Sequence, residues 1–380
     1  MRPPRLSSFP LNPVLFGSLL CLVSHAHYLC RFLMLVVHLG AGRHSSTFNE
    51  KYRKLLRRAL GSDLRSAARC IEHSALTNTG YGAALDVSGA VACDATVLQG
   101  ARGVCTSLSL LAVVDACPTQ VCLEEMARQA EECAQTGLLR PLVMIAPPAS
   151  SGEALVLPAA RALYKKYIQS TNLQDHLLTQ ESEENGGTSF VPAANPKPQI
   201  SVKPMSLAEE ETSLIFPVLD TVGYIEIGTE TTAAVSLGGH WLRPKGRVSC
   251  AGIPGAGVAL AGRGSVQVCC LCSGQGDDIV RMTLASHVCD QLLREALDAP
   301  ALGPLLVKTI EERAKLAGIE SAYVGVLATV AIEGRVQLVF CHSTESFYFG
   351  FRAADGRPRI VLSRAEAGFV SGEYSIGRLQ

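Results

Sequence analysis

The chain has 380 residues, of which 48% are hydrophobic and 18% are charged. This composition excludes a charge-rich disordered protein, and the balance of 34 basic against 34 acidic residues gives no electrostatic reason to expect a nucleic-acid partner. The 14 cysteines are spread along the chain, as is typical of buried reduced thiols in a cytosolic or nuclear protein. Cys269, Cys270 and Cys272 stand close together without further ligands at zinc spacing, so no metal site is predicted.

The N-terminal segment is apolar over much of residues 13–40 and follows Arg2 and Arg5. Such a segment is typical of a signal peptide or an anchor. Histidines and Arg31 interrupt it, and the uninterrupted apolar run is shorter than the ~20 residues that a membrane span requires. We therefore expect residues 1–31 to be a leader, either unstructured or used for targeting, and we predict no contact with a membrane.

Regular elements are predicted from residue 32 onwards. Residues 32–42 predict a buried strand that ends in a glycine turn, and the apolar spacing from Tyr52 to Ile71 predicts a helix. Residues 76–100 contain short runs separated by glycines, which predicts a β-meander. Two more helices are predicted over 121–135 and 159–168, with a strand over 142–146 between them.

A polar stretch over residues 170–211 predicts a long exposed linker. The patterns after it predict strands over 222–227, 231–235 and 266–272. They then predict a helix face from Ile279 to Leu297 and a helix over 305–316. Three last strands are predicted in YVGVLATV, VQLVFC and SFYFGF. Helices thus lie between two sets of strands in the sequence. This order predicts an α+β fold in which helices enclose sheets, rather than alternating βαβ units.

The linker region ends in LIFPVLDTVG, so Thr221 stands at the start of a predicted strand. A threonine hydroxyl is a poor nucleophile without a neighbouring base. If the bond between Asp220 and Thr221 is cut, the new α-amine of Thr221, with an ordinary pKa of about 7.7 to 8, can serve as that base. The same hydroxyl can attack the carbonyl of Asp220 and form an ester that water then opens. Taken alone, DTVG is equally a simple turn before a strand.

Further motifs accompany it in both halves of the chain. DTVG is followed by VSLGG (235–239), KGRV (245–248) and SGQGD (273–277), and it is preceded by HLGAG (38–42), TNTGYG (77–82) and CDATVLQG (93–100). Together these resemble the asparaginase-type N-terminal-nucleophile hydrolases over roughly residues 32–375. CHSTES (341–346) is similar to the HTTES segment of the threonine aspartases, or taspases, within that family. The resemblance implies an αββα four-layer sandwich of the N-terminal-nucleophile hydrolase type.

The resemblance also implies roles for individual residues. Thr221 would be the nucleophile, Arg247 would hold the carboxylate of the aspartate before the cut bond, and Ser273 with Gly274 would form the oxyanion hole. Asn78 and Gly276 would contribute to substrate binding. The glycines Gly80 and Gly82 of the Asn78 segment are as well explained by a turn as by function.

Two positions depart from the family pattern. Leu237 stands where the family has a serine or threonine that assists the nucleophile, and the neighbouring Ser236 is a weak substitute because adjacent strand side chains face opposite ways. Phe48 stands where taspases have a lysine for the acidic substrate, and Lys51 is near it in sequence without being equivalent. Leu237 bears on the reaction rate, and Phe48 bears on the substrate affinity.

The function implied is that of a threonine endopeptidase made as an inactive precursor. Cutting at Asp220–Thr221 would divide it into an α part (32–220) and a β part (221–380), with two such pairs forming a homodimer. Its substrates would be nuclear regulatory proteins cut after aspartate, without a metal or organic cofactor, in the nucleus or cytoplasm or both. KYRKLLRR (51–58) is either a nuclear import signal or a solvated helix face.

Two alternatives remain open. One is an L-asparaginase or β-aspartyl peptidase of the same superfamily, against which CHSTES and the long linker argue. The other is a catalytically impaired relative that keeps the fold as a binding module, which Leu237 and Phe48 favour.

Overall fold

The computed structural model describes residues 33–101, 104–147, 152–170 and 221–378. The predicted leader (1–31), Asp220 and nearly all of the predicted linker lie outside these residues. Within the described part of the chain, no helix is both long enough and apolar enough to cross a membrane.

The larger sheet has eight strands in the order β12-β11-β1-β5-β6-β2-β3-β4. Neighbouring strands are antiparallel except for β3 and β4. Its strands are β1 (Met34–Gly42), β2 (Cys93–Ala101), β3 (Val104–Val113), β4 (Val143–Ile145), β5 (Val222–Ile227), β6 (Thr231–Leu237), β11 (Ser346–Arg352) and β12 (Pro358–Arg364). The predicted start of the β part therefore lies in the middle of this sheet, where β5 pairs with both β1 and β6.

The smaller sheet has five antiparallel strands in the order β13-β10-β9-β8-β7. They are β7 (Val258–Arg263), β8 (Val266–Gly274), β9 (Val324–Ile332), β10 (Arg335–His342) and β13 (Val370–Arg378). This sheet packs against the larger one, with β1 and β5 in contact with β8.

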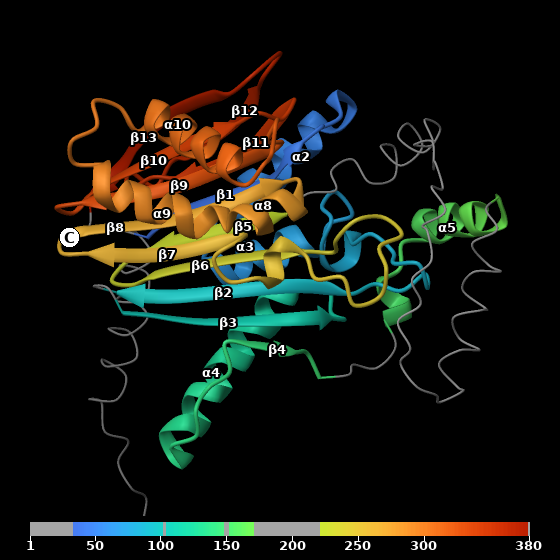
Figure 1. The fold of residues 1–380 in the computed structure, drawn as a ribbon. Coiled ribbons are helices and arrows are strands. Elements are labelled where there is room, and N and C mark those ends of the chain that lie inside the picture. The colour runs from blue at the N-terminus through green and yellow to red at the C-terminus, as the bar shows by residue number, and fades with distance from the viewer. Residues whose placement is uncertain (1–32, 102–103, 148–151, 171–220, 379–380) are drawn as a thin grey trace, which may run out of the picture.

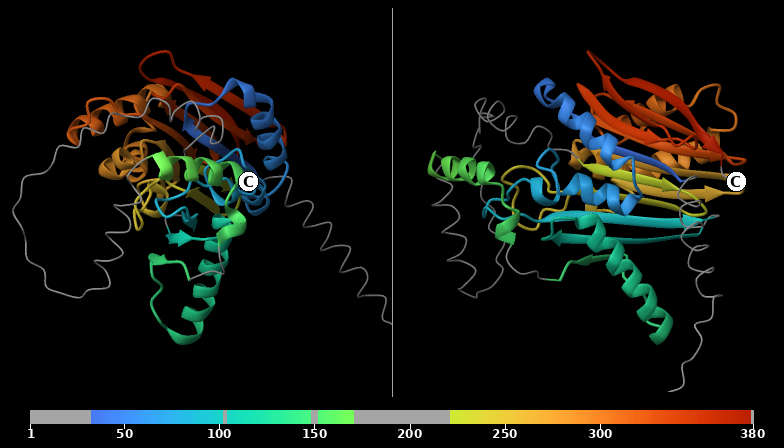
Figure 2. Two further views of the ribbon diagram at one scale, coloured as in Figure 1. Left: turned by 90° about the vertical axis from the view of Figure 1, so that its right-hand side faces the viewer. Right: turned by 180° about the vertical axis from the view of Figure 1, so that it is seen from behind.

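Helices pack on the outer sides of both sheets. On the larger sheet, α3 (Leu64–Glu72) contacts β5 and α4 (Pro118–Thr136) contacts β2 and β3, while α2 (Asn49–Ala59) packs near β11 and β12. On the smaller sheet, α9 (Leu284–Glu295) contacts β7 and β8, and α10 (Leu302–Leu316) contacts β10 and β13. The two helix groups lie on opposite sides of the strands in Figure 1 and in the rear view of Figure 2. The remaining helices are α5 (Pro158–Ser170) and α8 (Gly276–Met282).

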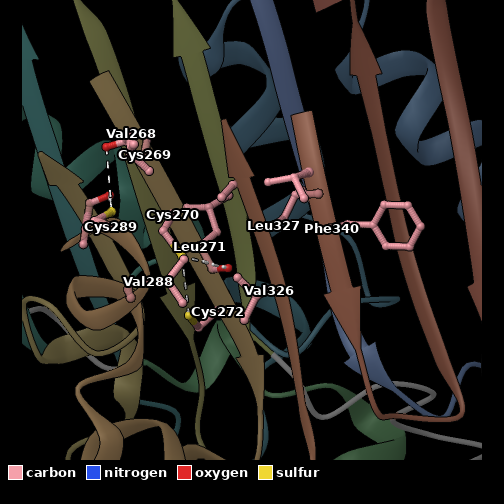
Figure 3. Packing of buried hydrophobic residues seen from close by; sticks show 14 of the residues in the cluster. Val268, Cys269, Cys270, Leu271, Cys272, Val288, Cys289, Val326, Leu327 and Phe340 are labelled. Carbon is pink, nitrogen blue, oxygen red and sulfur yellow. Dashed lines mark hydrogen bonds between the residues drawn. The ribbon is translucent and has the colours of Figure 1, made fainter. Parts of the chain in front are cut away.

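The main core lies between the two sheets and extends under α9 and α10. Figure 3 shows its cysteine-rich part, where Cys269, Cys270 and Cys272 of β8 lie near Cys289 of α9. These thiols are buried, and burial raises the pKa of each. They act here as small apolar side chains that let a helix approach a central strand closely.

Most predicted elements are confirmed, and so is the α+β class. The strands β1, β4, β5, β6, β8, β9, β10 and β11 and the helices α4, α5 and α10 form where the patterns predicted them. The strands β3, β7, β12 and β13 were not predicted.

Three predictions were wrong. The single helix predicted between Tyr52 and Ile71 is two helices, because Asp63 accepts a hydrogen bond from the Ser66 N–H and so caps the start of α3. The helix face from Ile279 to Leu297 is divided between α8 and α9 at Thr283, which has a left-handed backbone (φ 44°). The β-meander over 76–100 is a long loop followed by β2 alone. In that loop, the polar side chains of Asn78 and Thr79 form hydrogen bonds with β6 and the turn after it.

Candidate active site

Thr221 directly precedes β5 and is 1% exposed. Its Oγ1 lies 3.5 Å from the sulfur of Cys250, which is in the 3-10 helix Cys250–Gly252. A β-carbon on Gly276 at the start of α8 would lie 3.9 Å from the same sulfur. Cys250 thus joins the candidate nucleophile to the candidate binding segment around Gly276.

The end of β6 lies beside Thr221. Val222 pairs with Ser236, and Thr221 and Leu237 each stand one residue further on, on the side of the sheet that faces the core with Cys250. Leu237 is 7% exposed and belongs to the core between the sheets. Ser236 faces the opposite side, where its hydroxyl donates to Glu72 and accepts from Thr79. The structure therefore does not place Ser236 as a substitute hydroxyl for Thr221.

Asn78 ties the loop before β2 to the end of β6. Its Nδ2 donates to the carbonyl of Gly239 (2.8 Å), and its Oδ1 accepts from the Ala84 N–H (2.8 Å). Its own carbonyl accepts from the Gly238 N–H (2.7 Å). The Asn78 side chain thus uses one N–H and one lone pair of its oxygen for these contacts, and its direct effect is to hold Gly239 and the loop at Ala84 in place. Both loops lie at the right-hand end of the strands in Figure 1.

Ser273 and Gly274 end β8. The Ser273 hydroxyl is fully buried and accepts a hydrogen bond of 3.0 Å from the Ala41 N–H of the HLGAG segment. Gly274 has φ +121°, and an added β-carbon would collide with the Tyr323 carbonyl, so this position requires glycine. The end of β8 is therefore tied through the Ser273 hydroxyl to β1, which pairs directly with β5.

Arg247 forms an ion pair with Asp277, with 2.5 Å between Nη2 and Oδ1. Asp277 directly follows Gly276 in the first turn of α8. The side chain of Arg247 is 23% exposed and that of Asp277 is 61% exposed, so solvent reaches this pair. The guanidinium therefore lies beside the first turn of α8, the helix whose Gly276 faces the sulfur of Cys250.

Phe48 lies at the end of a short 3-10 helix before α2. Its ring packs edge-on against Tyr52, and the Lys51 ammonium group lies 4.9 Å from the ring centroid. The two residues therefore form a cation–π pair rather than presenting an isolated lysine. Residues 51–58 form part of α2, and Tyr52 and Leu56 are its buried residues in this stretch.

CHSTES packs inside the protein beside the HLGAG segment. His342, Thr344 and Ser346 are fully buried, and Ser346 Oγ accepts from the backbone N–H of His44 and donates to the carbonyl of Gly42. The segment thus holds the end of β1 in position. It also contacts Ser363 through His342 and the start of β9 through Ser343, whose hydroxyl accepts from the Val324 N–H.

Two histidines of this region are held neutral. Burial lowers the pKa of His38 to about 3, and burial is also the main cause that lowers the pKa of His44 to about 3. Neither ring nitrogen of His38 has a partner within the described residues. His38 pairs with Gly223 across β1 and β5, and a β-carbon at Gly223 would collide with its ring. His38 is therefore a neutral packing group on β1. It lies opposite Gly223, which follows Thr221 by two residues.

Cys250 and Glu72 were missed by the sequence analysis. Cys250 follows KGRV closely, but a single cysteine carries no signal of its own. Glu72 lies in the last turn of an amphipathic helix, where a carboxylate is expected to face solvent, whereas it is fully buried. The contact of Cys250 with Thr221 and that of Glu72 with Ser236 are visible only in the folded chain.

Comparison with known proteins defines the class. A family model described as asparaginase matches residues 153–342, which is half of the chain. The chain belongs to this family of N-terminal-nucleophile hydrolases. It is also similar to a plant-type L-asparaginase of Pyrobaculum calidifontis, with 26% identity over 356 residues that cover 87% of this chain and 99% of the relative.

Proposed function

We propose that this protein is a threonine hydrolase that cuts itself between Asp220 and Thr221 and then cleaves protein substrates after aspartate. The observation that carries the proposal is the position of Thr221. It starts a central strand, its hydroxyl contacts Cys250, and Cys250 contacts the segment that bears the Arg247–Asp277 pair. A candidate nucleophile, a candidate carboxylate-binding group and a glycine turn thus come from three separate segments of the chain.

The first reaction follows from this position. Thr221 Oγ1 attacks the carbonyl carbon of Asp220, the C–N bond breaks, and the nitrogen of Thr221 takes a proton and becomes an amine. The resulting ester joins Asp220 to the threonine oxygen, and water hydrolyses it to a carboxylate and a hydroxyl. Because the attacking group and the bond are on adjacent residues, proximity replaces an external nucleophile.

The second reaction uses the amine that the first one releases. The α-amine of Thr221 accepts the hydroxyl proton while Oγ1 attacks the substrate carbonyl. Arg247 binds the aspartate side chain, exchanging Asp277 for the substrate carboxylate. Backbone N–H groups of the Ser273–Gly274 turn stabilise the oxyanion, and Asn78 keeps Gly238 and Gly239 in place. This route requires no metal or organic cofactor.

The arrangement of the layers supports the same proposal. Helices α3 and α4 lie on one sheet, α9 and α10 lie on the other, and the sheets face each other. We propose that this is the αββα sandwich of the N-terminal-nucleophile hydrolases, divided after the cut into an α and a β part. Two such pairs would form the homodimer. The substrates would be regulatory proteins of the nucleus or cytoplasm.

The acidic groups near the site favour a peptide over a free amino acid. Asp277 is paired with Arg247, and buried Asp94 accepts from the Ser249 N–H and lies 4.0 Å from Arg243. A free amino acid has an α-ammonium group that needs an anionic or carbonyl partner, whereas the same atom in a protein substrate is an uncharged amide. Buried Asp94 keeps these partners when a substrate binds, so it is not available to such an ammonium group.

A second candidate is an L-asparaginase or β-aspartyl peptidase. The relative from Pyrobaculum calidifontis favours it, because it bears that name and aligns over nearly its whole length. The impaired binding module is the third reading, and Leu237 beside Thr221 favours it.

The deciding experiment has two stages. Intact mass and gel analysis of the purified protein should show two fragments, with Thr221 as the new N-terminus, while Thr221→Ala stays as one chain. The cut protein is then given an aspartate-containing protein, a β-aspartyl dipeptide and asparagine in parallel. Cleavage of the protein after aspartate supports the endopeptidase. Turnover of the small molecules alone supports the second candidate, and an uncut wild-type chain supports the binding module.

A further inference from the structure

Glu72 is a buried acidic residue that the proposed reaction does not use. It ends α3 and is 0% exposed. Burial raises the pKa of its carboxyl group, against the effect of the hydrogen bonds that it accepts. No basic side chain in the described parts of the chain forms an ion pair with it. Burial of a carboxyl group without a cation is costly, so its presence here calls for a specific purpose.

Donors from three elements converge on this carboxyl group. Its Oε1 accepts from the hydroxyls of Ser236 (2.5 Å) and Thr119 (2.5 Å), and Tyr224 OH lies 3.5 Å from the same oxygen. Its Oε2 accepts from the backbone N–H of Thr119 in the first turn of α4 (3.1 Å). Glu72 therefore connects α3 and α4 with β5 and β6, using only acceptor atoms.

One branch of this network leads to the candidate active site. Thr79 Oγ1 donates to Ser236 Oγ (2.9 Å), and Ser236 is the β6 residue that pairs with Val222, the residue after Thr221. The adjacent bonds join Asn78 to Gly238 and Gly239. The 77–82 loop is thus hydrogen-bonded to Ser236, Gly238 and Gly239 at the end of β6. Glu72 accepts a hydrogen bond from Ser236 on the helix side of the sheet.

We propose that Glu72 is a positioning residue, which fixes the end of β6 against the start of β5 and so sets Thr221 in its reactive position relative to Asn78 and the Gly238–Gly239 turn. This inference rests on the proposed function, because it concerns the same nucleophile. Glu72 itself lies on the helix side of the sheet and touches neither Thr221 nor the substrate. Its effect passes through Ser236 and the backbone of β5 and β6.

The test compares self-cleavage rates of three variants made by cell-free synthesis, followed by a timed chase on gels. Glu72→Gln has the same shape but replaces one acceptor by an NH2 donor, which opposes the donors that surround it. We expect it to fold and to split about 10²-fold more slowly than the wild type, which is the order of effect produced by a 1 Å misplacement of reacting groups. Ser236→Ala removes only the branch towards the site, and we expect it to split roughly 10-fold more slowly, a smaller share of the same misplacement effect.

Thr231→Val is the matched control. Thr231 begins the same strand, is 3% exposed, and its hydroxyl donates to Gln267 Oε1 (2.8 Å) far from Thr221. Like Ser236→Ala, it loses one buried hydroxyl from β6, so both should lower the thermal midpoint similarly. Of these two variants, only Ser236→Ala should slow self-cleavage. If the network had a merely structural role, the self-cleavage rate would fall in every variant in proportion to the fall in its thermal midpoint.

The outcomes separate this inference from the proposed function. Splitting of Glu72→Gln and Ser236→Ala at the wild-type rate overturns the positioning role while the nucleophile stands. Equal slowing in Thr231→Val and Ser236→Ala overturns it as well. If Glu72→Gln fails to fold, the comparison of Ser236→Ala with Thr231→Val decides alone. A wild-type chain that never splits overturns both the proposed function and this inference.

Discussion

The hydroxyl oxygen of Thr221 lies 3.5 Å from the sulfur of Cys250, and both side chains are buried. The same sulfur lies close to Gly276, where α8 begins. Cys250 therefore fills the space between the candidate nucleophile and the segment that leads to Arg247's partner, Asp277. A larger side chain at position 250 would press against Thr221 Oγ1, because the two groups are already in contact.

The size of residue 250 should accordingly decide whether the chain cuts itself. Cys250→Ser keeps a small polar side chain, and we expect a rate within about threefold of wild type, since the contact is a weak hydrogen bond at most. Cys250→Leu adds carbon atoms against Thr221 Oγ1 in a packed site and should stop the cut. Gels of the two purified variants measure this. A split Cys250→Leu protein with a normal melting temperature would contradict it.

Leu237 should limit the rate of the reaction. Its side chain shares a sheet face with Thr221, so Leu237→Ser would place a hydroxyl beside the nucleophile. We expect self-cleavage to become faster by roughly 10-fold or more, towards the 10²-fold range of a positioned proton-transfer group. The truncation should also cost about 2–4 kcal/mol of stability, because Leu237 belongs to the core.

Leu237→Ala separates these two effects. It leaves a similar cavity without the hydroxyl, so it should lose stability and gain no rate. Equal rates for the serine and alanine variants would show that the missing hydroxyl is not the cause of slow cutting.

Arg247 should govern substrate affinity. Its guanidinium already binds the carboxylate of Asp277, which shows that it can reach and hold such a group. Arg247→Lys keeps the charge but loses the two-pronged geometry, so KM for an aspartate-containing peptide should rise by roughly 10-fold to 100-fold with a smaller change in kcat. Steady-state kinetics of the cut enzyme measure both constants.

Asp277→Asn provides the opposite change. It removes the carboxylate that competes with the substrate for Arg247, so KM should fall. A rise in KM in this variant would mean that the ion pair orients Arg247 rather than occupying its binding position.

His38 and His44 should make the protein less stable in acid. The pKa of each is lowered to about 3 in the folded state, against about 6.5 in an unfolded chain. Below pH 6.5 the unfolded state therefore binds protons that the folded state does not. The stability that comes from keeping the two histidines neutral is fully present above pH 6.5. Below that, the free energy of unfolding falls by about 1.4 kcal/mol per pH unit and per histidine as the pH drops towards 3.

Urea unfolding at pH 7, 6 and 5 measures this effect. Because other groups titrate in the same range, His38→Leu is the required comparison, since it removes one of the two histidines and leaves its apolar surroundings filled. Its unfolding free energy should fall with acid less steeply than that of the wild type. Parallel pH profiles for the two proteins would show that His38 does not carry the dependence.

The amino-acid sequence by itself determined most of the element types and gave the candidate positions of the chemistry. Runs of apolar residues marked β5, β8 and β9, and the DTVG, KGRV and SGQGD segments marked the chain positions that meet in the candidate site. These features are local, since periodicity and turn chemistry depend on neighbouring residues. The single helix predicted from Tyr52 to Ile71 was wrong for the same reason, because one capping residue, Asp63, overrode an otherwise continuous pattern.

Only the tertiary structure decided which side chains face the nucleophile. Ser236 and Leu237 are adjacent in the chain, and the pairing of Val222 with Ser236 directs the serine to Glu72 and the leucine to Thr221. The contact of Cys250 with Thr221 and the contact of Glu72 with Ser236 exist only because the fold brings β6, α3 and the 3-10 helix Cys250–Gly252 close together. The physical reason is that a side chain's sheet face depends on strand register, and what it meets on that face depends on contacts with distant segments, such as Ser236 with Glu72.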